Sequence, residues 1–276
     1  SLADNDVYGI PLLMAIGWRG KPGIKDEPQH KKQGRVMLQM LCSMEIPYKV
    51  IYKSDNVEKV KYKVSAIIKN INKNNSPCAI VIEKGLFEPY SLQLSSRKTY
   101  KLNREKAMHV VLQNINTKNI IVSTTGYTSR ELYEFRQKNK RSYNSDFLTV
   151  GGMGHANQIA AGIAMHERKP TFCFDGDGSI LMHMGSLAIN ASLKLKNFKH
   201  VVFNNGSHES VGGQPTVGHN IKLSKIAKNC GYGLTLVATT KQQIISSMQK
   251  INKFKGSSFL EVMISNGTRE NLARPD

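Results

Sequence analysis

Short apolar runs alternate with longer segments of helical periodicity along most of the chain. The run at 10–16 ends at Gly17, which is typical of a buried parallel strand. The same pattern predicts further strands at 47–52, 78–82, 120–123, 171–174, 200–204, 234–238 and 258–263. It predicts helices at 31–44, 57–70, 104–114, 129–138, 157–166, 180–195, 223–230 and 241–251. This alternation indicates an α/β protein whose doubly wound parallel sheets carry helices on both faces.

The helical and strand patterns fall into two segments of unequal completeness. Residues 86–103 lose the periodicity and become polar, which predicts a linker at 91–103. The segment before it, 1–90, holds only about three strands and resembles the C-terminal part of a domain. The segment after it, 104–276, holds enough strands for a whole doubly wound sheet.

Composition changes this picture little. The chain has 39 Lys and Arg against 20 Asp and Glu, a formal net charge of +19. Its lysines are dispersed without a long basic run, so we expect solvated faces and no nucleic-acid partner. A positive field would also attract an anionic substrate. The acidic start, the short apolar runs and four scattered cysteines predict a cytoplasmic protein with reduced thiols and no membrane partner.

Two polar motifs follow neighbouring strands of the predicted sheet. The strand at 171–174 runs into Gly176-Asp177-Gly178, and the strand at 200–204 ends in Asn204-Asn205. Either motif alone is typical of an ordinary turn. Carboxyl ends of parallel strands meet at one edge of a sheet, so we expect the carboxylate and the amide to lie side by side. Such oxygen ligands suit Mg²⁺, and glycines let a backbone approach a phosphate closely.

The two motifs together resemble the signature of thiamine diphosphate enzymes. That resemblance implies thiamine diphosphate and Mg²⁺ as cofactors and a thiamine diphosphate-binding fold, with a partial pyrimidine-type domain before a complete diphosphate-type domain. It implies three metal ligands: Asp177, the side chain of Asn205 and the backbone carbonyl of Ser207. Residues implied to hold the diphosphate are Gly176, Gly178, Ser179 and, after the strand at 120–123, Thr125, Gly126 and Thr128.

A glycine-rich stretch at 150–156 is similar to the segment that holds the cofactor's aminopyrimidine in these enzymes. The resemblance implies that the Gly151 carbonyl accepts a hydrogen bond from the exocyclic amine. It implies that Met153 is the apolar wedge that bends the cofactor. Without the neighbouring motifs, Met153 would be interpreted as a core residue.

Several longer stretches resemble the phosphonopyruvate decarboxylase family over nearly the whole chain. They are 16–23, 25–30, 33–35, 124–132, 206–216, and Arg269 with 274–275. Sulfopyruvate decarboxylases share much of this pattern, so both remain open. The resemblance implies decarboxylation of a small anionic 2-oxo acid, in which the thiamine cofactor serves as an electron sink.

The anionic group of such a substrate needs cationic partners. Candidates are Arg19, Lys25, Arg269 and Arg274, although each is also compatible with ordinary surface charge. His30 and His208 are candidates for proton transfer, because imidazole titrates near neutral pH.

One departure from the family pattern bears on activity. The family's first domain supplies a Glu that hydrogen-bonds the cofactor's pyrimidine nitrogen, and its segment lies upstream of the strand at 10–16. Asp4 and Asp6 are in the wrong context to replace it. We therefore expect either a fragment of a longer enzyme or a partner polypeptide that supplies the missing part. A homo-oligomer, at least a dimer, is implied by the resemblance, and a catalytically silent cofactor-binding or assembly chain is the alternative.

Overall fold

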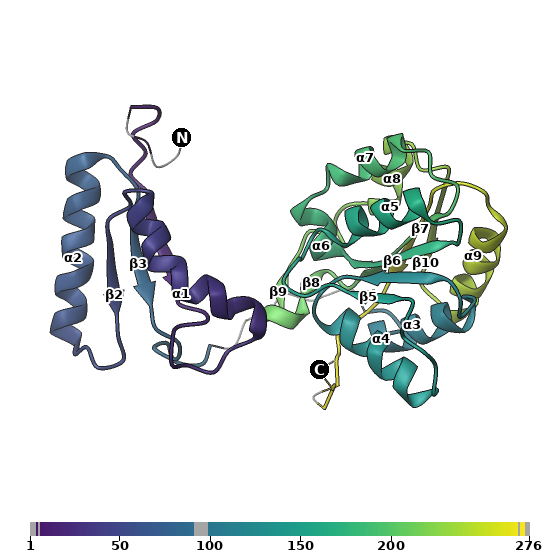
Figure 1. Cartoon of the computed structure of the whole chain (residues 1–276), viewed down its shortest axis with the longest axis horizontal. Helices are drawn as coiled ribbons and strands as arrows, with labels where there is room; N and C mark the ends of the chain where they lie inside the picture. Colours follow the sequence, from purple (N-terminus) through teal and green to yellow (C-terminus); the bar gives the residue numbers. More distant parts are fainter. Residues whose placement is uncertain (1–3, 5, 91–98, 270, 274–276) are drawn as a thin grey trace. The chain divides into compact units, whose positions relative to one another are not determined.

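The computed structural model describes residues 4, 6–90, 99–269 and 271–273 of the chain (Figure 1). It divides into two compact units, Ser1–Ser91 and Leu92–Asp276, which are described separately below. Arg274 and most of the predicted linker, 91–98, lie outside the described residues. The described end of that linker packs onto the second unit, because the Tyr100 amide donates to Ser265 Oγ at 2.5 Å.

The first unit is a three-stranded parallel sheet with two helices. In chain order its elements are β1 (Leu13–Gly17), α1 (Pro28–Ser43), β2 (Tyr48–Ile51), α2 (Val57–Asn74) and β3 (Cys78–Ile82). The strand order is β1-β3-β2, so β3 is central. Alternate residues of β3 face opposite helices: Ala79 and Val81 pack with α1, and Cys78 and Ile80 pack with α2.

The loop between β1 and α1 is fixed by a close backbone approach. Trp18 Nε1 donates to the Gly34 carbonyl at 2.8 Å, which ties the strand end to the helix. A Cβ on Gly34 would lie 2.2 Å from backbone atoms of Arg19 and Gly20. The helix can therefore pass this close to the loop only because position 34 has no side chain.

The second unit is larger and carries the predicted motifs. Its elements are α3 (Arg104–Gln113), β4 (Ile120–Ser123), α4 (Tyr127–Lys138), β5 (Asp146–Leu148), α5 (Ala156–His166), β6 (Thr171–Gly176), α6 (Asp177–Met182), α7 (Ser186–Ser192), β7 (Phe198–Asn204), β8 (Ser207–His208), η1 (Glu209–Val211), β9 (Gln214–Pro215), α8 (Leu223–Cys230), β10 (Leu234–Ala238), α9 (Lys241–Lys253) and β11 (Ser258–Met263). Six of the strands form one parallel sheet in the order β10-β11-β7-β6-β4-β5, and β8 and β9 form a small antiparallel pair.

Helices cover both faces of this sheet (Figure 1). Residues of α3, α4 and α9 pack with Phe172, Phe174, Val201 and Phe203 on one face. Residues of α5, α7 and α8 pack on the other face, where Cys173 faces inward. This confirms the predicted doubly wound parallel α/β fold. The chain leaves β4 in one direction to β5 and continues in the other direction from β6, so the topological switch point lies between β4 and β6.

Many boundaries differ from the predicted ones by a few residues, and three of the differences affect the second unit near the motifs. The single helix expected at 180–195 is two helices, α6 and α7, because the chain breaks helical geometry at His183 and restarts after Gly185, a weak helix former. The three-residue strand β5 is too short for a periodicity signal and was not predicted. Helix α4 begins at Tyr127 rather than 129, so Thr128 lies within its first turn.

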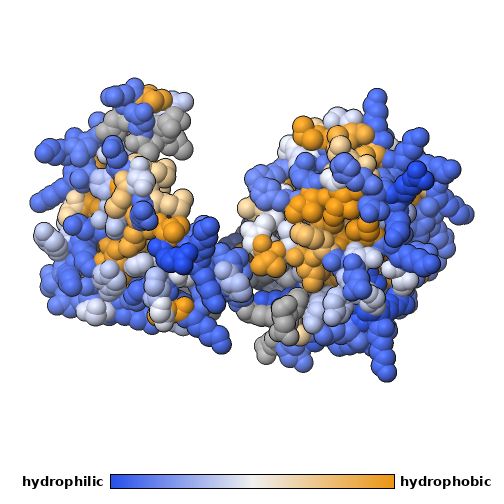
Figure 2. All heavy atoms as spheres, viewed as in Figure 1, coloured by the Kyte–Doolittle hydropathy of each residue, from blue (hydrophilic) through white to orange (hydrophobic). Residues whose placement is uncertain are grey.

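Apolar side chains also reach the surface of the second unit. Figure 2 shows them over the region of α5–α7, where Met165, Met182, Ile189 and Leu193 are exposed. Within the described residues, no helix is both long and apolar enough to cross a bilayer.

Candidate cofactor site

A pocket lies at the carboxyl edge of the large sheet, where β4, β6 and β7 end. Its empty volume is about 430 Å³, and it lies at the topological switch point. Ten predicted site residues line it: Thr125, Thr128, Met153, Gly176, Asp177, Gly178, Ser179, Asn205, Ser207 and His208. Six further residues line it: Thr124 and Tyr127, which flank the predicted Thr125 and Thr128 in the stretch 124–132, and Arg104, Phe203, Glu209 and Ser210.

Asp177 is the first residue of α6 and is almost completely buried, at 1% exposure. Burial raises the pKa of its carboxyl group, while hydrogen bonds from the Thr216 hydroxyl and the Asn205 backbone N–H lower that pKa. Among the described residues, no lysine or arginine forms an ion pair with it. A carboxylate buried without a basic partner is stabilised by a bound cation, so this position fits a metal ion.

Asn205 lies beside Asp177, since the backbone N–H of Asn205 donates to Asp177 Oδ1 at 3.3 Å. Its side-chain oxygen accepts from the Ser207 amide at 3.1 Å and keeps a second lone pair. Ser207 itself is buried, and its hydroxyl has no hydrogen-bond partner in the described part of the chain. The donor set of carboxylate, amide and carbonyl oxygens suits Mg²⁺.

The glycines and hydroxyls of the pocket form a surface for an anion. Thr124 Oγ1 and Ser179 Oγ lie 3.0 Å apart and join the loop after β4 to helix α6. Ser179 Oγ also accepts from the Gly154 amide at 3.1 Å. A Cβ on Gly178 would lie 2.5 Å from the His208 ring, so a glycine is needed where that imidazole packs on the backbone. The first amides of α6 have no acceptor within the helix and are available to an anion.

The glycine-rich stretch at 150–156 lies between β5 and α5. Gly151 and Gly154 have φ of +71° and +86°, which favours glycine at both positions. Met153, between them, reaches the pocket, whereas Gly151 does not line it. Gly126, the N-cap of α4 with φ of +91°, also lies outside the lining, and a Cβ there would contact the Ser210 side chain.

The predicted substrate residues that the structure describes are distributed over both units. Arg19 and His30 belong to the first unit and both contact Asp26, at 2.6 Å and 2.9 Å. The Arg19 side chain, the His30 side chain and the Gly20 amide hold the pKa of the Asp26 carboxyl far below its usual range. Lys25 is exposed.

Arg269 belongs to the second unit and does not line the pocket. Its guanidinium pairs with Glu105 of α3 at 3.0 Å and with Glu134 of α4. Its charge is therefore already shared by two carboxylates of the chain.

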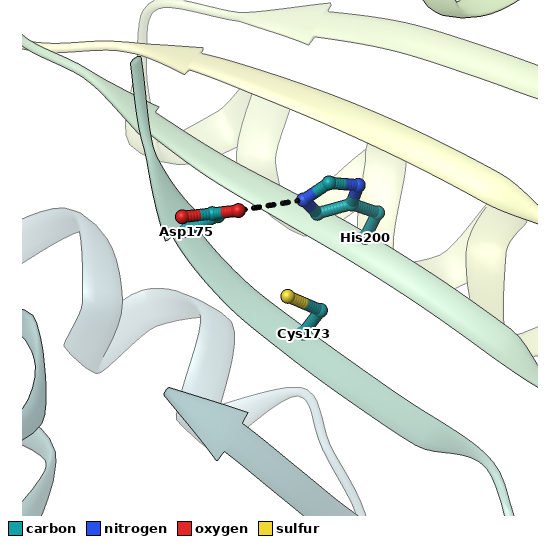
Figure 3. Close-up of side chains that lie close together, drawn as sticks. All are labelled: Cys173, Asp175 and His200. Carbon is teal, nitrogen blue, oxygen red and sulfur yellow. Dashed lines mark ion pairs between the residues drawn. The ribbon is translucent and has the colours of Figure 1, made fainter. Parts of the chain in front are cut away.

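A cluster of three buried polar side chains lies on β6, the strand that carries the motif, and on its neighbour β7 (Figure 3). Cys173 and Asp175 of β6 and His200 of β7 are fully buried on the same face of the sheet, and His200 Nε2 lies 3.4 Å from Asp175 Oδ2. Burial raises the pKa of the Cys173 thiol well above its ordinary value. Asp175 Oδ1 accepts from the Gly176 backbone N–H at 3.0 Å, so one member of this cluster contacts the first residue of the Gly176-Asp177-Gly178 motif.

Two features of the site had no signal in the sequence. Gly218 follows β9, and a Cβ there would lie 2.5 Å from Asp177 Oδ2, so this loop packs directly on the predicted metal ligand. Arg104 begins α3 and reaches the pocket from another part of the chain. Nothing in local spacing predicts either contact, because both depend on loops that return to the sheet edge.

Comparisons with known proteins agree with this geometry. The family described as "Thiamine pyrophosphate enzyme, C-terminal TPP binding domain" matches residues 123–262, just over half of the chain. The chain belongs to this family of thiamine pyrophosphate enzymes. Of the residues that line the pocket at the ends of β4, β6 and β7, all except Arg104 lie within the matched segment.

Individual proteins that the chain resembles share between 17% and 38% of its residues in the aligned parts. A phosphonopyruvate decarboxylase of Streptomyces viridochromogenes is 28% identical over 96% of this chain and 69% of its own length. A sulfopyruvate decarboxylase subunit beta of Methanocaldococcus jannaschii is 38% identical over 44% of this chain and 62% of its own length. The solved benzoylformate decarboxylase of Polynucleobacter necessarius is 17% identical with a TM-score of 0.53, which shows the fold. This chain covers 50% of that structure, which covers 94% of this chain.

Proposed function

We propose that the chain is the cofactor-anchoring part of a decarboxylase that uses thiamine diphosphate and Mg²⁺ to convert 3-phosphonopyruvate to phosphonoacetaldehyde and CO₂. The observation that carries the proposal is the buried Asp177 carboxylate beside Asn205, at the switch point of a parallel sheet. The phosphonopyruvate decarboxylase of Streptomyces viridochromogenes, which matches almost the whole chain, supports the choice of substrate.

In this proposal each part of the pocket has one role. Asp177, the Asn205 side chain and the Ser207 carbonyl hold Mg²⁺, and Gly178 and Ser179 hold the diphosphate. The Gly151 carbonyl and Met153 hold and orient the aminopyrimidine. When bound, the cofactor supplies an electron sink for the loss of CO₂. Residues 104–276 are then the diphosphate domain and residues 1–90 the C-terminal part of a pyrimidine-type domain.

The substrate's anionic group is proposed to bind basic side chains, and protons are proposed to move through imidazoles. Of the two candidates for proton transfer we favour His208, because it lines the pocket against Gly178. Arg19, Lys25, Arg269 and Arg274 remain candidates for the anion, and His30 a second candidate for proton transfer. For Arg269 to serve, it would have to exchange a carboxylate partner for the substrate.

We propose that a further segment or chain supplies the activating Glu. Among the described residues no strand pairs with the outer edge of β1, and Leu13 on it is 43% exposed, as expected of a strand that can pair further. A relative described as subunit beta offers a precedent for several chains. The exposed apolar side chains over α5–α7 provide a surface for a second copy.

Calorimetric titration with thiamine diphosphate, with and without Mg²⁺, tests the anchoring role. We expect binding that requires Mg²⁺ and that Asp177→Ala weakens at least tenfold, since a metal ligand is lost. Equal binding by the native chain and Asp177→Ala would contradict the proposal.

Substrate and completeness need a separate assay. Turnover of 3-phosphonopyruvate and sulfopyruvate should be compared with and without the missing N-terminal half supplied in trans. We expect turnover of 3-phosphonopyruvate only with that half present. Preference for sulfopyruvate would make the protein a sulfopyruvate decarboxylase, and cofactor binding without any turnover would favour a silent assembly chain.

A further inference from the structure

Glu209 lies at the edge of the cofactor pocket and contacts three different parts of the second unit. Its Oε2 accepts from Asn205 Nδ2 at 3.1 Å and from the Arg104 guanidinium at 3.0 Å. Its Oε1 accepts from the Gly267 amide at 2.6 Å. Both oxygens are thus already used by the chain's own donors, so Glu209 is placed to hold its neighbours rather than to bind a ligand.

The contact with Asn205 decides which way its carboxamide points. A carboxamide has an oxygen end that can bind a cation and an NH₂ end that cannot. An ionised carboxylate only accepts hydrogen bonds, so Glu209 is compatible with the NH₂ end alone. The oxygen end then lies on the other side, where the Ser207 amide donates to it at 3.1 Å.

Glu209 is itself held in place by a buried network. Arg104 is buried, with 7% of its surface exposed, and forms a two-pronged pair with Glu131, with N–O distances of 2.9 and 3.0 Å. It also donates to the Thr268 hydroxyl at 2.6 Å. A planar guanidinium that is fixed through Nε and Nη2 gives a defined direction to the third nitrogen, Nη1, which donates to Glu209.

We propose that Glu209 is a positioning residue that fixes the amide orientation of Asn205, so that its oxygen and not its NH₂ group faces the cation. This inference rests on the proposed function, because it assigns Asn205 to the metal. Partners that orient a metal ligand typically change metal affinity by about 10- to 100-fold.

The test compares Glu209→Gln in two backgrounds, with Mg²⁺ affinity measured calorimetrically at saturating thiamine diphosphate. In the native background, we expect Glu209→Gln to weaken Mg²⁺ binding about tenfold or more, since glutamine accepts either end of the amide. In the Asn205→Asp background both side-chain ends are oxygens, so orientation no longer matters. There we expect Glu209→Gln to leave Mg²⁺ affinity unchanged or to increase it by removing a like charge.

Glu131→Gln is the matched control, because Glu131 pairs with the same Arg104 but does not contact Asn205. Thermal unfolding of each variant without ligand measures the structural cost separately. A weakening by Glu209→Gln that is equal in both backgrounds, or equal to that of Glu131→Gln, would overturn the inference. If the native chain binds no thiamine diphosphate with Mg²⁺, the proposed function fails instead, so the two failures are distinguishable.

Discussion

Gly218→Ala tests whether the loop after β9 determines the position of Asp177. Gly218 is buried, and its φ lies outside the left-handed region, so alanine adds no backbone strain there. The new Cβ would lie 2.5 Å from Asp177 Oδ2 and 2.7 Å from Asn204 Oδ1. The perturbation is therefore a single methyl group pressed against the proposed metal ligand.

The size of the effect follows from the displacement required. Ordinary carbon contacts begin near 3.4 Å, so the Asp177 oxygen and the loop must separate by roughly 0.9 Å. A misplacement of about 1 Å in a binding constellation can cost on the order of 100-fold. We expect affinity for thiamine diphosphate with Mg²⁺ to fall between 10- and 100-fold, equivalent to about 1.4–2.7 kcal/mol. Overpacking should also lower the free energy of unfolding by about 1–3 kcal/mol.

The assay is calorimetric titration of the native chain and Gly218→Ala, with urea unfolding of both. Gly162→Ala is the control, because a Cβ at this exposed position of α5 meets no atom within 4 Å. It should bind normally and unfold at an equal or higher urea concentration. Native affinity in Gly218→Ala would refute the claim that this loop positions Asp177.

Three further predictions concern folding and chemistry elsewhere in the chain. Gly34→Ala should lower the stability of the first unit by several kcal/mol in urea unfolding, because its Cβ meets backbone at 2.2 Å; a change below about 1 kcal/mol would contradict this. Burial raises the pKa of Glu134, but the Ala273 amide and two basic side chains lower it more, to about 2. The stability from that carboxylate is present above about pH 4.5 and lost as pH falls toward 2, so urea midpoints should fall less steeply there for Glu134→Gln than for the native chain. Iodoacetamide at pH 8 should label exposed Cys42 in the native protein and buried Cys173 only after unfolding, as mass spectrometry would show; native labelling of Cys173 would contradict its burial.

The fold could be predicted from the sequence because alternating strands and helices leave few topologies. Asp177 and Asn205 could be brought together in advance, since the carboxyl ends of adjacent parallel strands share one edge. The hydrogen bond from the Asn205 backbone N–H to the Asp177 carboxylate shows that the two residues do lie side by side. The order of the strands and the residue that follows each one are enough to place these two side chains at one edge.

The rest of the pocket depends on loops that no periodicity describes. Arg104 precedes the motif by more than 70 residues and reaches it only because α3 packs beside the returning chain near Thr268. Gly218 and Glu209 belong to the irregular segment after β7, where short strands and a 3-10 turn decide which side chains face Asp177. Their contacts with Asp177 and Asn205 follow from tertiary packing, which the periodicity of strands and helices does not describe.

The charges around the pocket suggest how its two proposed ligands depend on each other. The chain carries a net charge of +19, yet three carboxylates, Asp177, Glu131 and Glu209, lie in or beside the pocket, where Glu131 and Glu209 share the guanidinium of Arg104. A diphosphate entering alone would meet an excess of negative charge at short range, where the distant lysines are screened beyond about 8–10 Å. A divalent cation on Asp177 reverses the sign of that field. On the proposed function, the long-range charge brings the anion to the protein, and the metal lets it enter the pocket.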